Sequence, residues 1–211
     1  QAVDGKSNEI TAIPDLLDTL VLEGAIVTID AMGTQKEIAT KIVAKKADYV
    51  LALKGNQSTL KNDAALFFAD PALTADCPCH KETTSGHGRI EERIVRAADA
   101  TWLARRHPEW TGLSSIAAIT NHSTNKKTGQ TTTETRLYIS SLPPDPVRLA
   151  AAARAHWSVE NNLHWSLDVA FREDECRTRK DHAARNLAMI RRAVLNMLRR
   201  DPTKLSLKRK R

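Results

Sequence analysis

The chain has 211 residues, of which 41% are hydrophobic and 27% charged, a composition ordinary for a globular protein with a sizeable core. No apolar run reaches the ~18–20 residues that a membrane helix needs, and no charged-then-apolar leader opens the chain, so no membrane partner is expected. Three cysteines are too few for a disulfide framework, which favours a reducing, cytoplasmic setting.

The net charge of +7 is concentrated at one end of the chain. Residues 172–211 carry fourteen Lys and Arg against five Asp and Glu, a balance of +9, and the remainder is slightly negative. Such a surplus suits a polyanionic partner, because each phosphate that is neutralised releases condensed counterions. A solvated helix face followed by a frayed basic tail explains the same distribution equally well.

The sequence from 14 to 53 predicts a helix and then a strand–helix–strand unit. Pro14 is expected to open the first helix, and 26–29 is a short buried strand that ends just before Asp30. Residues 48–53 form the next strand. Strands in such a unit are parallel, and ligands gather at their carboxyl ends, which is where Asp30 falls.

The helix between these two strands carries a capping motif and an apolar face. Thr34 and Glu37 match the T-x-x-E capping box at its start. Its buried side is predicted to consist of Ile38, Ile42 and Val43.

The middle of the chain is expected to be rich in β-structure. After a helix over 60–68, residues 70–88 are expected to form a loop, which carries Cys77, Cys79, His80 and His87. These are residue types of a zinc site, but they lack its usual spacing. Strands are predicted at 88–95, 113–120 and 132–141, the last two joined by a polar turn into an antiparallel hairpin.

The stretch 156–177 organises the last part of the chain, after a helix that begins at Val147. Glu160 sits one position off an apolar seam, with His156 and His164 four residues to either side. A carboxylate in this setting is costly unless it is paired or binds a metal, so a salt-bridged glutamate and a catalytic or metal-binding one both stay open. The seam recurs at helical spacing through Val159, Leu163, Leu167 and Ala170.

A final long helix is expected after Asp181, which would cap it. Residues 205–211 are expected to be disordered. The core stripe of the helix is predicted to be Leu187, Ile190, Val194, Met197 and Leu198, with a basic ridge on the other side made of Arg185, Arg192 and Arg199.

The sequence HWSVENNLHWSLDVAFRED, at 156–174, resembles the C-terminal signature of DDE transposases of the H-repeat-associated insertion-sequence group. Residues 7–20, 26–57 and 87–95 resemble further blocks of that family in the same order. The resemblance therefore covers nearly all of the chain.

This resemblance implies an α/β fold, a ribonuclease H-like mixed sheet with flanking helices and a β-rich insertion. Residues 1–69 and 143–200 would form the transposase core, 70–142 the insertion and 201–211 a basic tail. The function implied is a DNA transposase that carries out metal-dependent strand cleavage and transfer during insertion-sequence transposition.

Two carboxylates match the family's catalytic, metal-binding positions: Asp30 in TIDAMG matches its second aspartate, and Glu160 its glutamate. The cofactor implied is Mg²⁺ or Mn²⁺, two ions in a complete member, because hard cations take oxygen ligands and a pair stabilises both reacting oxygens. The partners implied are insertion-sequence ends and target DNA, with a homodimer as one option. The residues expected near DNA are His156, Trp157, Arg172, Arg177, Arg185 and Arg192.

The family's first aspartate lies in a block that precedes the segments matched here. Asp4 copies only the DGK of that block, so this aspartate is expected to be missing and the chain to be a fragment truncated at its N-terminus. The missing strands would leave an open apolar sheet edge. Two carboxylates hold two Mg²⁺ poorly, so a non-catalytic DNA-binding remnant is an alternative function. A helix-borne zinc hydrolase built on His156, Glu160 and His164 is another.

Overall fold

The computed structural model describes residues 9–86 and 88–211, with the backbone alone at Glu9, Glu160 and Asn161. Asp4 and His87 lie outside the described residues. The chain divides after Ala153 into two compact units, each of which is described by itself.

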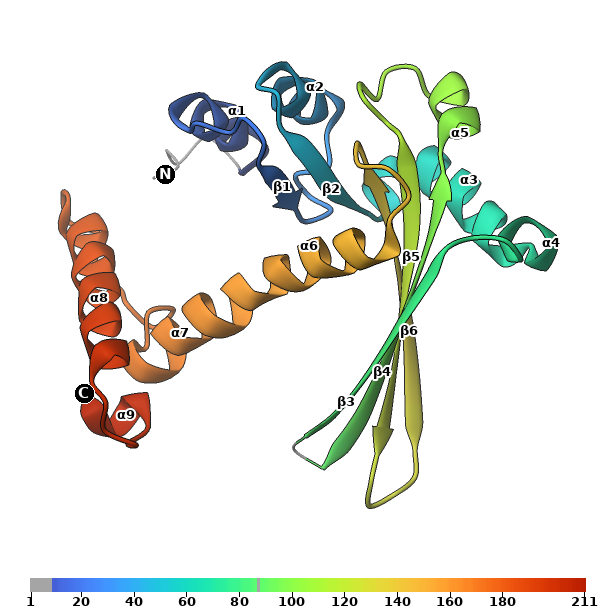
Figure 1. The fold of residues 1–211 in the computed structure, drawn as a ribbon. Helices are drawn as coiled ribbons and strands as arrows, with labels where there is room; N and C mark the ends of the chain where they lie inside the picture. Colours follow the sequence, from blue (N-terminus) through green and yellow to red (C-terminus); the bar gives the residue numbers. More distant parts are fainter. Residues whose placement is uncertain (1–8, 87) are drawn as a thin grey trace. The chain divides into compact units, whose positions relative to one another are not determined.

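The first unit is built on a mixed sheet, six-stranded within the described residues (Figure 1). β1 and β2 run parallel, and every other neighbouring pair is antiparallel. The α/β class is therefore confirmed, and the strands of the middle segment continue the sheet that β1 and β2 begin. In spatial order the strands are β1 (Ile26–Ile29), β2 (Asp48–Leu53), β6 (Thr131–Ser140), β5 (Ser115–Asn125), β4 (Arg89–Asp99) and β3 (Cys79–Gly86).

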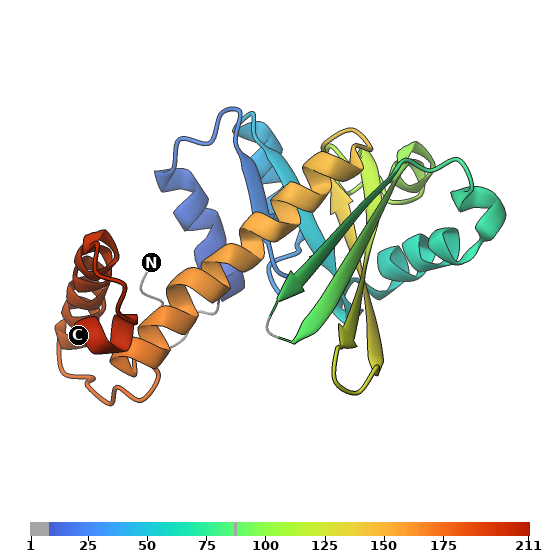
Figure 2. The same cartoon turned by 60° about the horizontal axis from the view of Figure 1, so that its bottom comes forward.

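Helices cover both faces of this sheet (Figure 2). Leu51 of β2 points to one core and the neighbouring Val50 to the other, because successive strand residues alternate. The start of α6 (Pro146–Val159) packs on the Val50 side through Leu149 and Ala153. The core on the Leu51 side is formed with α1 (Glu9–Thr19), α2 (Lys36–Ala44), α3 (Ser58–Ala69) and α5 (Thr101–Arg106).

The predicted strand–helix–strand unit is confirmed, but its capping box is wrong. Gln35 is the N-cap of α2 and makes no side-chain capping bond. Thr34 is fully buried, and its hydroxyl lies 3.1 Å from the Asp30 carbonyl oxygen and 2.7 Å from that of Ala52. The hydroxyl therefore joins the loop after β1 to strand β2, a long-range contact that local spacing does not encode.

Pro14 lies inside α1 and does not open it, contrary to the prediction. Proline there removes one backbone hydrogen bond of the helix. Ile10, Ile13 and Leu17 form one apolar face that spans the proline, with Ile13 and Leu17 in the core. Burial of this face explains why the helix tolerates the loss.

Residues 70–88 are not a loop, because they include helix α4 (Pro71–Thr74) and strand β3. Asp70 caps α4 by accepting a bond from the Ala72 amide, and β3 pairs with β4 along its whole length. Cys79 and His80 are consecutive in β3 and point to opposite faces. Among the described residues, no three His, Cys, Asp or Glu side chains group as metal ligands would.

The predicted hairpin is confirmed as β5–β6, and its strands run further than expected. The turn shortens because hydroxyl and imidazole pairs bridge the ends of the strands, at Thr120–Thr135, His122–Thr133 and Thr124–Thr131. These polar ends extend past the helices of the first unit in Figure 1. The burial pattern agrees, since residues 131–135 are exposed.

The second unit is helical, with α7 (Trp165–Phe171), α8 (Ala183–Arg200) and α9 (Leu207–Lys210). Its fully covered apolar side chains are few: Leu167, Ala170 and Leu195. The prediction of a disordered tail is wrong, because Lys210 donates to the carbonyl oxygens of Leu198 (3.3 Å) and Asp201 (2.6 Å). This ammonium group satisfies carbonyls at the C-terminus of α8.

Helix α8 exists as predicted, but its cap and its core stripe differ. His182 precedes it without a side-chain capping bond, and Asp181 has φ of +48°. Leu187, Val194 and Leu198 are half-buried, whereas Ile190 and Met197 are 57% and 70% exposed. In the described part of this unit, the helices that pack closely on α8 are the short α7 and α9, and Arg191 of α8 also pairs with Glu173, so a limited strip of its surface is covered.

No helix in the described part of the chain is long and apolar enough to span a membrane.

Replacement of Gly33 by any residue with a Cβ, even alanine, is predicted to destabilise the folded protein. An added Cβ would lie 2.3 Å from Ile29 Cγ2 and 2.8 Å from Ile13 Cδ1, so Gly33→Ala should cost about 1–3 kcal/mol of unfolding free energy. Gly55→Ala is the matched control, since its Cβ would meet nothing within 4 Å. Urea unfolding measures the unfolding free energy of both variants. Equal stability of Gly33→Ala and Gly55→Ala would show that Gly33 does not pack closely against Ile29 and Ile13.

Candidate active site

Asp30 stands at the carboxyl end of β1 with one oxygen fixed and the other available. Its Oδ1 accepts bonds from the backbone amides of Met32 (3.1 Å) and Gly33 (3.3 Å). Within the described residues no hydrogen bond reaches its Oδ2, and the side chain is exposed to solvent. Because this carboxylate is already held in place, binding a cation through its other oxygen costs little further conformational entropy.

The loop that carries Asp30 is clamped by residues that follow β2. The Asn56 amide donates to the Ala31 carbonyl at 2.6 Å, and the Gln57 amide donates to the Thr34 carbonyl at 3.0 Å. With the Thr34 hydroxyl, these bonds fix the two strand ends together at the sheet edge where α/β proteins bind ligands. The sequence pattern assigned no role to either amide, because their partners lie 23 and 25 residues away.

Glu160 begins a π-helical turn, η2 (Glu160–His164), between α6 and α7. A π turn takes one more residue than an α turn, is rare, and is frequent at functional sites. The predicted seam assumed unbroken α spacing and is wrong at its start: Val159 is 48% exposed, whereas Leu167 and Ala170 are buried. The extra residue rotates the helix that follows out of register with the helix that precedes.

Rings and imidazoles surround this turn, as the sequence indicated. His156 is half-buried, and its ring meets that of Trp157 edge-on with centroids 5.6 Å apart. Trp157, His164 and Trp165 are exposed. The turn is therefore accompanied by a solvent-facing aromatic surface.

The arginines predicted to lie near DNA fall into two kinds. Arg177, Arg185 and Arg192 have exposed side chains. Arg172 ends α7 in the left-handed conformation, at φ of 51°, and its guanidinium lies 3.7 Å from Glu175. Arg199, the third member of the predicted ridge, donates to the carbonyl oxygen of Asn162, so the freely exposed ridge consists of Arg185 and Arg192.

A buried ion pair between α3 and α5 was not foreseen from the sequence. Asp63 and His107 are 8% and 7% exposed and meet at 2.8 Å, and Arg106 lies 3.3 Å from the same carboxylate oxygen. Their separation of 44 residues gives no motif. The pair joins α3 to the C-terminal end of α5, and Arg106 is a second partner of the same carboxylate.

The environment of Cys176 was likewise not predictable from motif spacing in the sequence. Hydrogen bonding from the Arg191 guanidinium, reinforced by the backbone and hydroxyl of Thr178, lowers the pKa of this thiol to about 7. Much of the Cys176 side chain is therefore thiolate at neutral pH.

Asp30 belongs to the first unit and Glu160 to the second, so the geometry of each is given within its own unit. Their sharing of one metal ion stays a prediction. What the structure supplies is a fixed carboxylate at a strand end and a glutamate at a helical irregularity.

The family model described as the transposase DDE domain matches residues 1–197, which is most of the chain. The chain belongs to the DDE transposase domain family. Its resemblance to the H-repeat-associated group is confirmed by relatives of about 40% identity.

Three relatives of this transposase chain come from Escherichia coli. "H repeat-associated putative transposase YhhI" of strain K12 is 39% identical over 98% of this chain and 56% of its own length. "Putative protein YbfL" of K12 is 40% identical over 98% and 56%, and "Putative transposase YncI" of O157:H7 is 40% identical over 93% and 51%. The transposase chain thus spans about half the length of the curated relatives it matches.

Proposed function

We propose that this chain forms part of the catalytic domain of a DNA transposase, with Asp30 and Glu160 as two of its metal-binding carboxylates. The observation that carries the proposal is Asp30, whose carboxylate is fixed by two amides at a strand end and keeps one oxygen free of hydrogen bonds within the described residues. Asp30 also occupies the position of a catalytic aspartate in the motif TIDAMG. The π turn at Glu160 supports the second assignment.

The sheet is proposed to be part of a larger, ribonuclease H-like one. Among the described residues β1 pairs only with β2, so its other edge has no partner there. The relatives are nearly twice as long, and strands from the part that they have in addition would cover this edge. We place the first catalytic aspartate on that additional part. Residues 1–69 and 143–200 then belong to the core, 70–142 to the insertion and 201–211 to the tail.

The donor set fits Mg²⁺ or Mn²⁺, because both candidates are hard carboxylate oxygens and Asp30 is exposed at a ligand-binding sheet edge. Divalent ions bound there would stabilise the charge that develops on the oxygens of a phosphodiester. The protein's own contribution is to hold the carboxylates: Thr34, Asn56 and Gln57 fix the loop beneath Asp30.

Double-stranded DNA, both insertion-sequence ends and target, is the proposed partner in the cytoplasm. Exposed Arg177, Arg185 and Arg192 supply positive charge, and the exposed rings of Trp157 and Trp165 can stack on unpaired bases. A homodimer is part of the same proposal, since Ile190 and Met197 leave apolar surface on α8 uncovered.

A DNA-binding remnant without catalysis is the second candidate. The observation that favours it is the exposure of the arginines in a chain whose surplus positive charge lies in its last forty residues. Such a remnant would bind DNA, and loss of the two carboxylates would not weaken its Mn²⁺ binding, so metal binding separates the two candidates.

Mn²⁺ binding, followed by electron paramagnetic resonance, tests the metal site. Asp30→Asn and Glu160→Gln should each weaken binding by more than about tenfold, exceeding the effect of changing a residue outside the ligand set. Asp18→Asn is the control, because Asp18 is exposed and paired with Lys41. Unchanged affinity in both ligand variants would leave only the DNA-binding remnant.

The salt dependence of DNA binding tests the basic surface. The double variant Arg185→Gln/Arg192→Gln should reduce the slope of log affinity against log salt by about two, one for each lost phosphate contact. Lys36→Gln/Lys46→Gln removes the same charge at residues paired with Glu109 and Glu23, and should leave the slope unchanged. An equal effect of both double variants, or a flat salt dependence of the parent chain, would rule out specific phosphate contacts by α8.

A further inference from the structure

The π turn interrupts a helix that is otherwise continuous from α6 to α7. In an α-helix the carbonyl of Asn162 would accept the amide of Ser166, four residues on. Hydrogen bonds in a π turn span five residues, so the regular spacing fails over 160–164 and a donor from outside the helix can bond a carbonyl of this turn.

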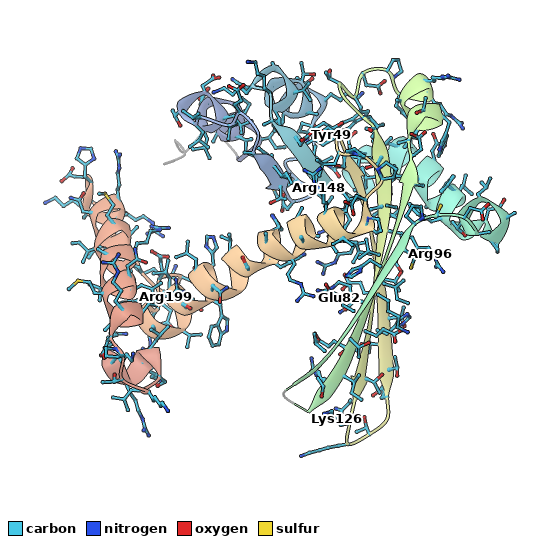
Figure 3. The ribbon with its side chains drawn as sticks, viewed as in Figure 1. Tyr49, Glu82, Arg96, Lys126, Arg148 and Arg199 are labelled. Atoms are coloured by element: carbon cyan, nitrogen blue, oxygen red, sulfur yellow. The ribbon has the colours of Figure 1, made fainter. Side chains whose placement is uncertain are left out.

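Arg199 supplies such a donor at this junction. Its guanidinium donates to the Asn162 carbonyl oxygen and lies 3.5 Å from the hydroxyl of Ser166. These are the two residues that an unbroken α-helix would have joined. Figure 3 shows Arg199 on the side of α8 that faces α7. Ser166, which the Arg199 guanidinium contacts, is buried.

We propose that Arg199 is a positioning residue that stabilises the π turn and thereby sets the backbone from which Glu160 reaches a metal ion. The inference rests on the proposed function, since it takes Glu160 as a metal ligand. A planar guanidinium with several fixed donors suits two acceptors at once, and a charged donor makes a stronger bond than a neutral one.

Two other basic side chains of this unit donate to carbonyls of helices, and they differ from Arg199 in one respect. Lys210 donates to Leu198 and Asp201, and Arg211 to Ala170, all at the C-terminal ends of helices. Free carbonyls at helix ends are a general feature. The Asn162 carbonyl lies inside the π turn of a helical run, where a bond from an outside side chain is unusual.

The direction in which metal affinity changes when Arg199 is removed separates a positioning role from a simple electrostatic one. Removing a positive charge near a cation site raises the affinity for that cation, by Coulomb's law. Loss of a residue that orients a ligand lowers the affinity, commonly by 10–100-fold. Arg199 and Arg200 are neighbouring arginines of α8, and of the two only Arg199 has a hydrogen bond to the turn among the described residues, so a matched comparison is available.

The test measures Mn²⁺ affinity by electron paramagnetic resonance, and melting temperature, for Arg199→Met, Arg199→Lys and Arg200→Met. We expect about tenfold weaker binding in Arg199→Met, an intermediate loss in Arg199→Lys, whose ammonium lacks the planar fork, and no loss in Arg200→Met. Affinity in Arg199→Met equal to or higher than that of the parent chain would overturn the proposal.

Two further comparisons allow the test to be interpreted if Arg199→Met does not fold or if Glu160 is not a metal ligand. If Arg199→Met does not fold, Arg199→Lys decides: parent-level affinity in that variant would overturn the proposal. Glu160→Gln is measured in parallel, and unchanged affinity there would refute the part of the proposed function that makes Glu160 a metal ligand. A loss in Glu160→Gln without any loss in the Arg199 variants would refute only the role of Arg199.

Discussion

The parallel pairing of β1 and β2, closed by the Thr34 hydroxyl, is the constraint on which the candidate site depends. β1 is four residues long and pairs only with β2 within the described residues, so few bonds hold it in place. The hydroxyl between the Asp30 and Ala52 carbonyl oxygens joins the two strand ends, and Asn56 and Gln57 complete the clamp. Gly33 lets the loop pass against Ile29 and Ile13, where no side chain fits. Asp30 stands where it does because of these contacts.

The second unit achieves order in a different way, since few of its apolar side chains are fully buried. Arginine and lysine side chains there satisfy backbone carbonyls: Lys210 at the end of α8, and Arg199 at the π turn. Part of the basic surplus that suggested a nucleic-acid partner is therefore hydrogen-bonded to the protein's own backbone. Exposed arginines without such a bond among the described residues, Arg185 and Arg192 among them, are the ones available to phosphate. Charge counted along a sequence does not separate these two uses.

Local pattern predicted the elements whose signals are local. The apolar runs 26–29 and 48–53 became β1 and β2 with the expected bounds, and the α2 face of Ile38 and Ile42 is buried. Predictions failed where a partner distant in the sequence determines the structure. Thr34 matched a capping box, but its hydroxyl bonds to a carbonyl of β2. The polar segment β3 is a strand because β4 pairs with it. The seam through Val159 failed because spacing cannot reveal a π turn. Asp30 and Glu160 were found through family motifs, whereas the Asp63–His107 pair, 44 residues apart, has no motif.

The proposal that matters most is that the carboxylates of Asp30 and Glu160 bind the same divalent ion. Iron-directed cleavage tests it most directly: Fe²⁺ replaces Mg²⁺, and hydroxyl radicals generated with ascorbate and peroxide cut the backbone only beside the bound iron. The account predicts two sets of cuts in the same sample, around residues 28–34 and around 158–164, both suppressed by excess Mg²⁺. Both sets should also disappear together in Asp30→Asn. Cutting at one segment alone, or at both with independent dependence on the two carboxylates, would contradict a shared metal site.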